Sequence, residues 1–123
     1  MAANLKTKEI IMSIEGIWTS QIYGLFGWEN NGVLIFMNGR VMGGGNNHYA
    51  VGSYSESGNN IEISLDIQYH GIPKTVFGTA EDQMSVVLNG SEDDEGVIKG
   101  EVSRTDKRKL SLAFRLIRRV DLP

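Results

Sequence analysis

The chain contains few residues of the kinds that carry out chemistry in enzymes. It has no cysteine and only two histidines, His48 and His70, among 123 residues. The lack of cysteine excludes disulfides, thiol nucleophiles, iron–sulfur clusters and zinc–thiolate sites. Neither histidine is placed with a serine and an acid in the pattern of a catalytic triad, nor with other metal ligands. We therefore expect both histidines at the surface, no metal or other cofactor, and no enzymatic activity.

A glycine-rich segment at residues 43–48 is the second candidate for a functional site. Its glycines could cradle a phosphate if the N-terminus of a helix followed them. The residues that follow, at 49–52, read Tyr-Ala-Val-Gly and have the composition of a strand. The segment is therefore predicted to be a flexible loop between two strands.

Four consecutive carboxylates, Glu92, Asp93, Asp94 and Glu95, form the third candidate. A calcium loop of the EF-hand type needs spaced oxygen ligands and a helix on each side, and this run has neither. Contiguous carboxylates in a hairpin loop are usually solvated, and the alternative is contact with a basic protein partner. These four residues are therefore candidates for partner contact.

Residues 16–18, Gly-Ile-Trp, resemble the Gly-x-Trp of lipocalin-like and avidin-like barrels. In those barrels the tryptophan closes one end and stacks under an arginine of the last strand, in a cation–π contact. For Trp18 that arginine could be Arg115, Arg118 or Arg119. The alternative is an ordinary tryptophan of the core.

The elements that must position these residues are predicted to be strands. Residues 61–69 alternate apolar and polar side chains, which gives a strand one buried and one solvated face. Residues 110–116 alternate in the same way. Asn38-Gly39 is the clearest turn signal, because a type I′ hairpin turn needs positive φ at both central residues. Strands are predicted at 10–23, 32–37, 40–44, 48–55, 60–69, 74–79, 84–89, 96–104 and 109–118.

Short sequential strands with hairpin-length connections predict an all-β protein. Fifteen glycines, many beside the turns, agree with this, and no helix of useful length fits between them. We expect an up-and-down antiparallel barrel of eight strands, because a meander of this length can close and remove its edges. A sandwich is the alternative. Residues 1–9 are predicted to be a flexible tail and residues 10–123 a single barrel domain.

The inward faces of such a barrel would line its interior. Eight strands give a lumen that side chains either fill or leave open for one small ligand. The sequence leaves both alternatives open. The candidates for interior or ligand-lining positions are Trp18, Phe36, Tyr54, Ile63, Leu65, Phe77, Leu112 and Phe114.

Charge is divided unevenly along the chain. The formal net charge is −3, with −8 over residues 1–98 and +5 over residues 99–123. The overall balance disfavours a nucleic-acid partner, and the division marks either a basic partner-binding edge or a solvated surface. No segment has the roughly 20 apolar residues of a membrane-spanning helix, and no secretory signal is evident. The default expectation is a cytoplasmic protein.

Residues 32–44, Gly-Val-Leu-Ile-Phe-Met-Asn-Gly-Arg-Val-Met-Gly-Gly, resemble the signature hairpin of the GrlR-like family. That family comprises small bacterial proteins related to a negative regulator of type III secretion. The resemblance covers about residues 14–118 and implies an eight-stranded, lipocalin-like barrel with an apolar interior, often dimeric. In the founding regulator an acidic loop binds a transcriptional activator. The matching loop here, residues 56–60, has a single acid, so that motif is not carried over.

These observations predict a non-enzymatic regulatory or adaptor protein that acts by binding another protein. The second hypothesis is a carrier that binds a small apolar ligand or lipid inside the barrel. A homodimer is also expected, with Ile117 and Val120 as candidates for the apolar centre of its interface. Arg118 and Arg119 lie beside them in the sequence and are candidates for partner contact.

Overall fold

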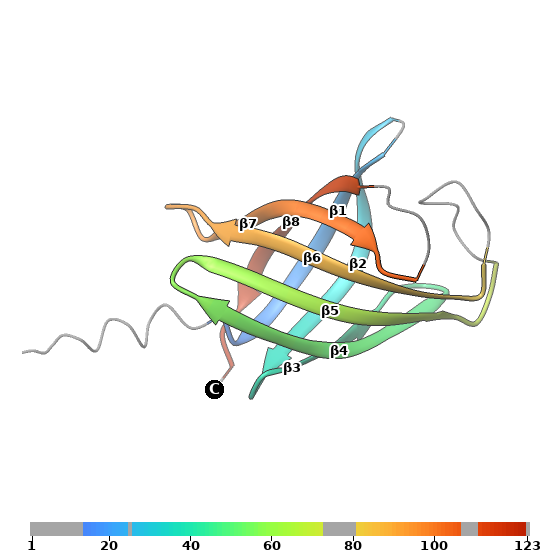
Figure 1. The fold of residues 1–123 in the computed structure, drawn as a ribbon, viewed down its shortest axis with the longest axis horizontal. Coiled ribbons are helices and arrows are strands. Elements are labelled where there is room, and N and C mark those ends of the chain that lie inside the picture. The colour runs from blue at the N-terminus through green and yellow to red at the C-terminus, as the bar shows by residue number, and fades with distance from the viewer. Residues whose placement is uncertain (1–13, 25, 73–80, 107–110, 123) are drawn as a thin grey trace, which may run out of the picture.

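The chain folds into a closed, up-and-down barrel of eight antiparallel strands (Figure 1), which confirms the predicted lipocalin-like architecture. The computed structural model describes residues 14–24, 26–72, 81–106 and 111–122, and these contain no helix. Each strand pairs with the next along the chain, and the first pairs with the last. The strands are β1 (Gly16–Gly24), β2 (Gly27–Met37), β3 (Arg40–Gly44), β4 (His48–Ser57), β5 (Asn60–Tyr69), β6 (Gln83–Glu92), β7 (Val97–Arg104) and β8 (Ser111–Val120).

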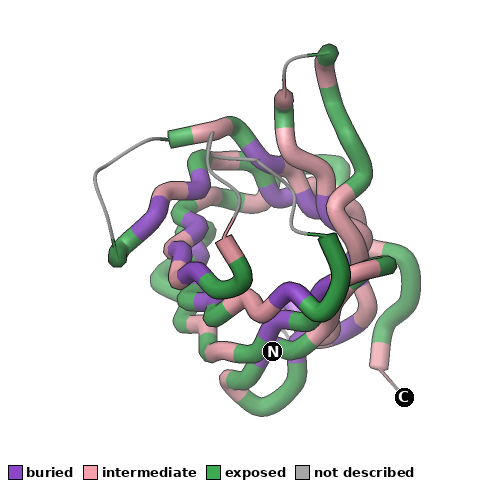
Figure 2. Tube along the Cα trace, turned by 90° about the vertical axis from the view of Figure 1, so that its right-hand side faces the viewer, coloured by how far each residue is buried: buried purple, intermediate pink, exposed green. Residues whose placement is uncertain are grey.

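Alternation along the strands decides which side chains enter the core. On β5, Ile61, Ile63 and Leu65 are buried while Glu62 and Ser64 between them are exposed. Figure 2 views the barrel from the right-hand end of Figure 1 and shows buried and exposed residues alternating around the wall. The core is therefore the inside of the barrel, filled from every strand.

The Asn38-Gly39 turn between β2 and β3 is confirmed. Both residues have positive φ, 54° and 79°, as a type I′ turn requires. The Asn38 amide donates a hydrogen bond to the Glu15 carboxylate at 2.8 Å, and the Gly39 carbonyl accepts one from the Tyr54 amide at 3.0 Å. The turn is thus tied to two neighbouring segments at one end of the barrel.

β2 begins at Gly27, five residues before the predicted start. The polar residues 29–31 conceal the strand because they do not alternate with apolar ones. They nevertheless pair with the end of β1, where Tyr23 lies opposite Trp28 and their rings meet edge to face at 5.3 Å. The Arg115 guanidinium stacks on the Trp28 ring at 4.2 Å. Ring and cation contacts therefore support a hairpin that hydrophobic periodicity does not reveal.

β1 begins at Gly16, so the described part of the predicted strand 10–23 is shorter at its start. Gly16 has a φ of 147°, and a Cβ there would meet the Val120 carbonyl oxygen at 2.5 Å. The Trp18 indole donates to the Ile14 carbonyl oxygen at 2.8 Å, which holds the preceding residues across the barrel end. Residues 10–13 and the predicted strand 74–79, with Phe77, lie outside the described residues.

Candidate functional site

One end of the barrel is closed by Trp18. Its ring is completely buried, and the Arg118 guanidinium of β8 lies over it at 4.6 Å. Arg118 also donates to the Glu15 carbonyl oxygen at 2.9 Å and to the Asp121 carboxylate at 2.8 Å. The predicted cation–π contact with an arginine of the last strand is therefore confirmed, and Arg118 supplies it.

Aromatic rings fill this closed end. The Trp18 and Phe36 rings meet edge to face at 6.2 Å, and the Phe36 and Tyr54 rings do so at 5.1 Å. Ile63, which lies opposite Tyr54 in the β4–β5 pair, is fully buried. Among the described residues, side chains therefore fill this end of the barrel.

Carboxyl groups surround the closed end. Burial raises the pKa of Glu56, and the nearby charges of Glu92 and Glu15 raise it further. Burial also raises the pKa of Glu92, while the Arg118 charge acts in the opposite direction. Trp18 and the Arg118 guanidinium above it therefore lie near several carboxyl groups.

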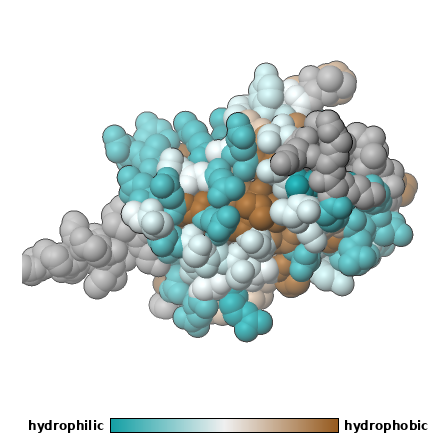
Figure 3. Space-filling view, viewed as in Figure 1, coloured by the Kyte–Doolittle hydropathy of each residue, from teal (hydrophilic) through white to brown (hydrophobic). Residues whose placement is uncertain are grey.

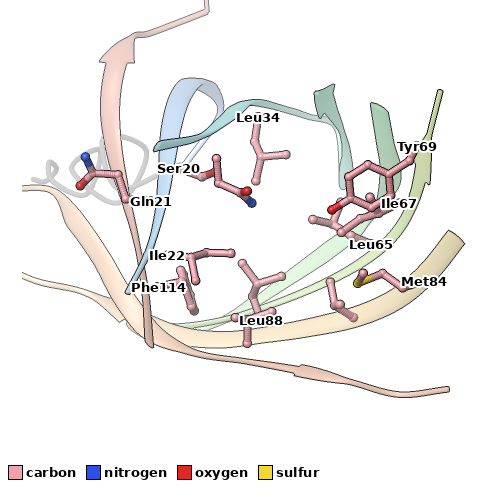
Figure 4. Close-up of a pocket in the computed structure, with 13 residues that line it drawn as sticks. Ser20, Gln21, Ile22, Leu34, Leu65, Ile67, Tyr69, Met84, Leu88 and Phe114 are labelled. Atoms are coloured by element: carbon pink, nitrogen blue, oxygen red, sulfur yellow. The ribbon is translucent and has the colours of Figure 1, made fainter. Parts of the chain in front are cut away.

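The opposite end of the barrel contains a cavity of about 50 Å³ (Figure 4). Figure 4 shows Leu34, Leu65 and Leu88 pointing into it from different strands. Aliphatic and aromatic side chains form most of its wall. The lining residues are Ser20, Gln21, Ile22, Asn31, Leu34, Leu65, Ile67, Tyr69, Met84, Val86, Leu88, Val102 and Phe114.

Two hydroxyl groups face this apolar space. Ser20 on β1 and Tyr69 on β5 are both buried, and burial raises the pKa of Tyr69. Within the described residues, neither hydroxyl has a hydrogen-bond partner. The Gln21 amide differs, because it accepts from Arg115 at 2.6 Å and donates to Asn30 at 3.0 Å. The Ser20 and Tyr69 hydroxyls, together with the Asn31 amide in the wall, are therefore polar groups available to a bound molecule.

Strand β7 carries a buried arginine next to the cavity wall. Arg104 faces the same side of the strand as Val102 and is only 6% exposed. Its guanidinium donates to Asp106 and to Glu81, each at 2.9 Å. These bonds raise the pKa of Arg104, and Arg104 lowers the pKa of Asp106. Arg104 is thus committed to two carboxylates and does not line the cavity.

The interior candidates named from sequence face the barrel interior wherever they are described. Trp18, Phe36 and Ile63 fill the closed end, while Leu65 and Phe114 line the cavity. Tyr54 and Leu112 pack against the core partly buried, and Phe77 lies outside the described residues. Sequence reasoning named few residues of the cavity wall, although alternation over residues 61–69 placed Leu65, Ile67 and Tyr69 on one face. The wall residues that it did not name as candidates are Ser20, Gln21, Ile22, Asn31, Leu34, Ile67, Tyr69, Met84, Val86, Leu88 and Val102.

The acidic run spans the end of β6 and the loop before β7. Glu92 is half-buried at the closed end, whereas Asp94 and Glu95 are exposed. The Asp93 carboxylate accepts from the amides of Val97 at 3.0 Å and Glu95 at 2.9 Å. These bonds, the one from Val97 above all, lower the pKa of Asp93. Asp93 therefore shapes the loop, and contact of this run with a partner stays a prediction.

The two arginines proposed for partner contact differ in their surroundings. Arg118 is held over Trp18 by the contacts described above. Arg119 is exposed, and its guanidinium donates to the Thr19 hydroxyl at 3.0 Å. Arg119 is thus the more accessible of the two.

The prediction that both histidines lie at the surface is wrong for His48. His48 is 9% exposed because it takes the inward position at the start of β4, where its ring packs on Tyr69 at 5.5 Å. A Cβ on Gly45 would meet the His48 ring at 2.8 Å, so any larger residue there would require the ring to shift. His70 is exposed, as predicted, and stacks on Tyr49.

Outward-facing apolar side chains form a continuous band on one side of the barrel. Val120, Ile17, Ile35, Met42 and Val51 lie opposite one another in successive strand pairs from β8 to β4. Four more apolar residues lie above and below this row. We call the nine together the apolar outer face: Ile17, Val33, Ile35, Met37, Met42, Tyr49, Val51, Ile117 and Val120.

The opposite side of the barrel is different in character. The outward positions on β5 include Glu62, Ser64 and Asp66, all exposed. Those on β6 and β7 include Asn89 and Glu101. Figure 3, viewed from the side of β4 to β7, shows hydrophilic residues over much of this surface. The barrel therefore has one apolar and one polar side.

Among the described residues, no three histidine, aspartate or glutamate side chains gather to hold a metal ion. The same ranges include no helix long and apolar enough to cross a membrane. Neither a family model nor a curated protein sequence matches the chain.

Proposed function

We propose that this protein is a non-enzymatic regulatory or adaptor protein that binds another protein as a dimer joined through its apolar outer face. The observation that carries the proposal is the uncharged row from Val120 to Val51 across five strands. Val120 and Val51 are each about half exposed, and Met42 at the middle is 39% exposed. Large side chains left in water at adjacent positions mark an interface. The resemblance to the GrlR-like family supports a regulatory role of this kind.

The size of the face fits the centre of a stable interface. Five strands about 4.8 Å apart span roughly 19 Å, and the five residues from Val33 to Met37 span about 14 Å. The apolar centre then covers roughly 270 Å² of wall. A standard interface covers about 800 Å² per partner, with a polar rim around an apolar core. Arg40 and Arg119, both exposed at the margins, would belong to that rim.

The occupant we propose is a second copy of the chain. A two-fold dimer presents the same patch on both subunits, so an apolar face without charge at its centre can pack on itself. Two such faces would stack like the sheets of a sandwich, about 10 Å apart. Ile117 and Val120, the candidates from sequence, lie at the β8 side of the face rather than at its centre.

The test places a charge in the middle of the face. Met42→Glu should turn a dimer into a 13.6 kDa monomer at micromolar concentration in sedimentation equilibrium, because the charge would be buried without a partner. Ser64→Glu, on the polar side of the barrel, is the matched control and should leave the dimer intact. A wild-type protein that sediments as a single monomer would overturn the proposed occupant. A dimer that survives Met42→Glu would overturn the proposed face.

The cavity supports a second function, that of a carrier for a small apolar ligand. It is lined mainly by aliphatic side chains, and it contains two hydroxyls without partners among the described residues. Native mass spectrometry of protein purified from its own host should then show a mass above that of the polypeptide. The same spectrum reports the oligomeric state, so both functions can be examined together.

A further inference from the structure

We infer that the cavity takes a small uncharged molecule with a short apolar chain and one hydroxyl or carbonyl group. The inference rests on the proposed carrier function and names the chemical class of its ligand. Three features of the cavity support it: its volume, its two hydroxyls, and the absence of charge among the described residues of its wall.

The volume fixes the size of the part that is enclosed. A water-sized sphere occupies about 10–15 Å³, so 50 Å³ holds roughly four non-hydrogen atoms. Leu34, Leu65, Leu88 and Phe114 offer these atoms only apolar contacts. The enclosed part of the ligand is therefore a short alkyl chain or a group of similar size.

The two hydroxyls fix the polar end. Ser20 and Tyr69 belong to β1 and β5, which are not neighbours in the barrel, and both face the cavity. Each hydroxyl can donate one hydrogen bond and accept others. A ligand hydroxyl or carbonyl that binds either one supplies a hydrogen bond that the described residues do not provide. A pure hydrocarbon would leave both unsatisfied.

The wall excludes ions. None of the thirteen lining residues carries a charge. Arg104, at the next inward position of β7, is a buried cation that already donates hydrogen bonds to Asp106 and Glu81. A ligand carboxylate could bind Arg104 only by displacing one of these two carboxylates. Burying an ion without a counter-charge is strongly unfavourable. A fatty acid anion or an amine is therefore rejected where the neutral molecule of the same length is accepted.

The experiment compares three molecules with the same four-carbon chain: butan-1-ol, butanoate and butylammonium. Each is titrated into the ¹⁵N-labelled full chain at pH 7, and amide shifts are followed by NMR. Butan-1-ol should shift amides around Ser20, Leu65 and Tyr69 and should bind at least tenfold more tightly than either ion. If an ion binds as well as butan-1-ol, the ligand class is wrong while the carrier function stands. If none of the three shifts these amides, the carrier function fails as well.

Conservative variants test the polar end. Tyr69→Phe and Ser20→Ala remove one hydroxyl each and should together weaken butan-1-ol binding at least fivefold. Tyr49→Phe removes the hydroxyl of an exposed tyrosine on the outside of β4 and is the matched control. Unchanged affinity in the Ser20 and Tyr69 variants would overturn the role given to the hydroxyls. Met42→Glu in the outer face should leave the titration unchanged, which separates this inference from the proposed dimer.

Discussion

The two ends of the barrel are built from the same strands, yet they are filled differently. At the closed end, Trp18, Phe36 and Tyr54 interlock and Arg118 covers them. At the other end, aliphatic side chains such as Leu88 and Val86 surround a cavity of about 50 Å³. The inward side chains differ, because aromatic rings pack on one another at the closed end whereas aliphatic chains, with Tyr69 and Phe114 among them, surround the cavity. The closed end thus stabilises the fold, and the other end contains a candidate binding site.

Removing the plug should produce the largest effect. Trp18→Ala should lower the free energy of unfolding by about 3–5 kcal/mol, since it deletes a fully buried ring and leaves Arg118 without its platform. Urea denaturation followed by circular dichroism measures this. Trp28→Ala, at a ring that is 38% exposed, is the control and should cost much less. If Trp18→Ala leaves the urea denaturation midpoint unchanged, the closed end does not stabilise the fold.

The same substitution should have opposite signs at the two ends. Val86→Ile adds a methylene beside the cavity and should stabilise the protein by about 0.8 kcal/mol. Val41→Ile adds it next to Phe36 at the closed end and should destabilise by about 1–3 kcal/mol, because no space is available there. Thermal unfolding of both variants provides the comparison, with Val87→Ile on the outer side of β6 as the control. Equal losses in Val86→Ile and Val41→Ile would mean that both ends are filled.

Acidic pH should affect the buried carboxyl groups of the closed end and the carboxylate paired with Arg104 in opposite directions, and these effects should be smaller than those of the substitutions above. The pKa values of Glu56 and Glu92 at the closed end are raised above 4.5 in the folded state. Their contribution to stability is therefore largest below pH 4.5 and is lost as the pH rises through the folded values. The pKa of Asp106, paired with Arg104, is lowered below 3.8, so its contribution is present above that value and lost as the pH falls.

Variants separate these two contributions. Denaturation midpoints measured from pH 7 down to pH 3 should rise first and then fall. Glu56→Gln together with Glu92→Gln should flatten the rise, and Asp106→Asn should flatten the fall. Glu62→Gln, on the polar outer side of β5, is the control for removal of a carboxylate. A rise that persists in the double variant would assign it to other groups.

The sequence predicted the architecture and the closed end better than the cavity. Two of the signals are local in sequence. Alternation over residues 61–69 predicts β5, and Asn38-Gly39 predicts the turn of the β2–β3 hairpin. The contact of Trp18 with Arg118 was predicted to within three arginines, because a tryptophan of the first strand must meet the last strand in a closed barrel. Which arginine reaches it depends on a register shift between Ile17 and Trp18 that periodicity does not encode.

The cavity could not be predicted because its volume is the space left between side chains that lie far apart in the sequence. Ser20 is a small polar residue with no sequence signal of burial, and only the pairing of β1 with two neighbours turns it inward. His48 has no serine–acid pair or metal ligand beside it in the sequence, which predicts a surface position, yet it is the first inward residue of β4. The early start of β2 was missed for a related reason, since the contacts that support Trp28 come from Arg115, far away in the sequence.

The pairing of β1 with β8 also sets the order in which the protein can be assembled on the ribosome. Ile17 lies opposite Val120, so the seam cannot form until nearly all of the barrel sequence has been synthesised. Until then β1 and the most recently formed strand each have an unpaired edge, the feature through which nascent chains join to wrong partners. A pairing between residues so distant in sequence also slows folding into the range of milliseconds to seconds. Closure of the seam is therefore the step at which the nascent chain depends most on protection from its neighbours.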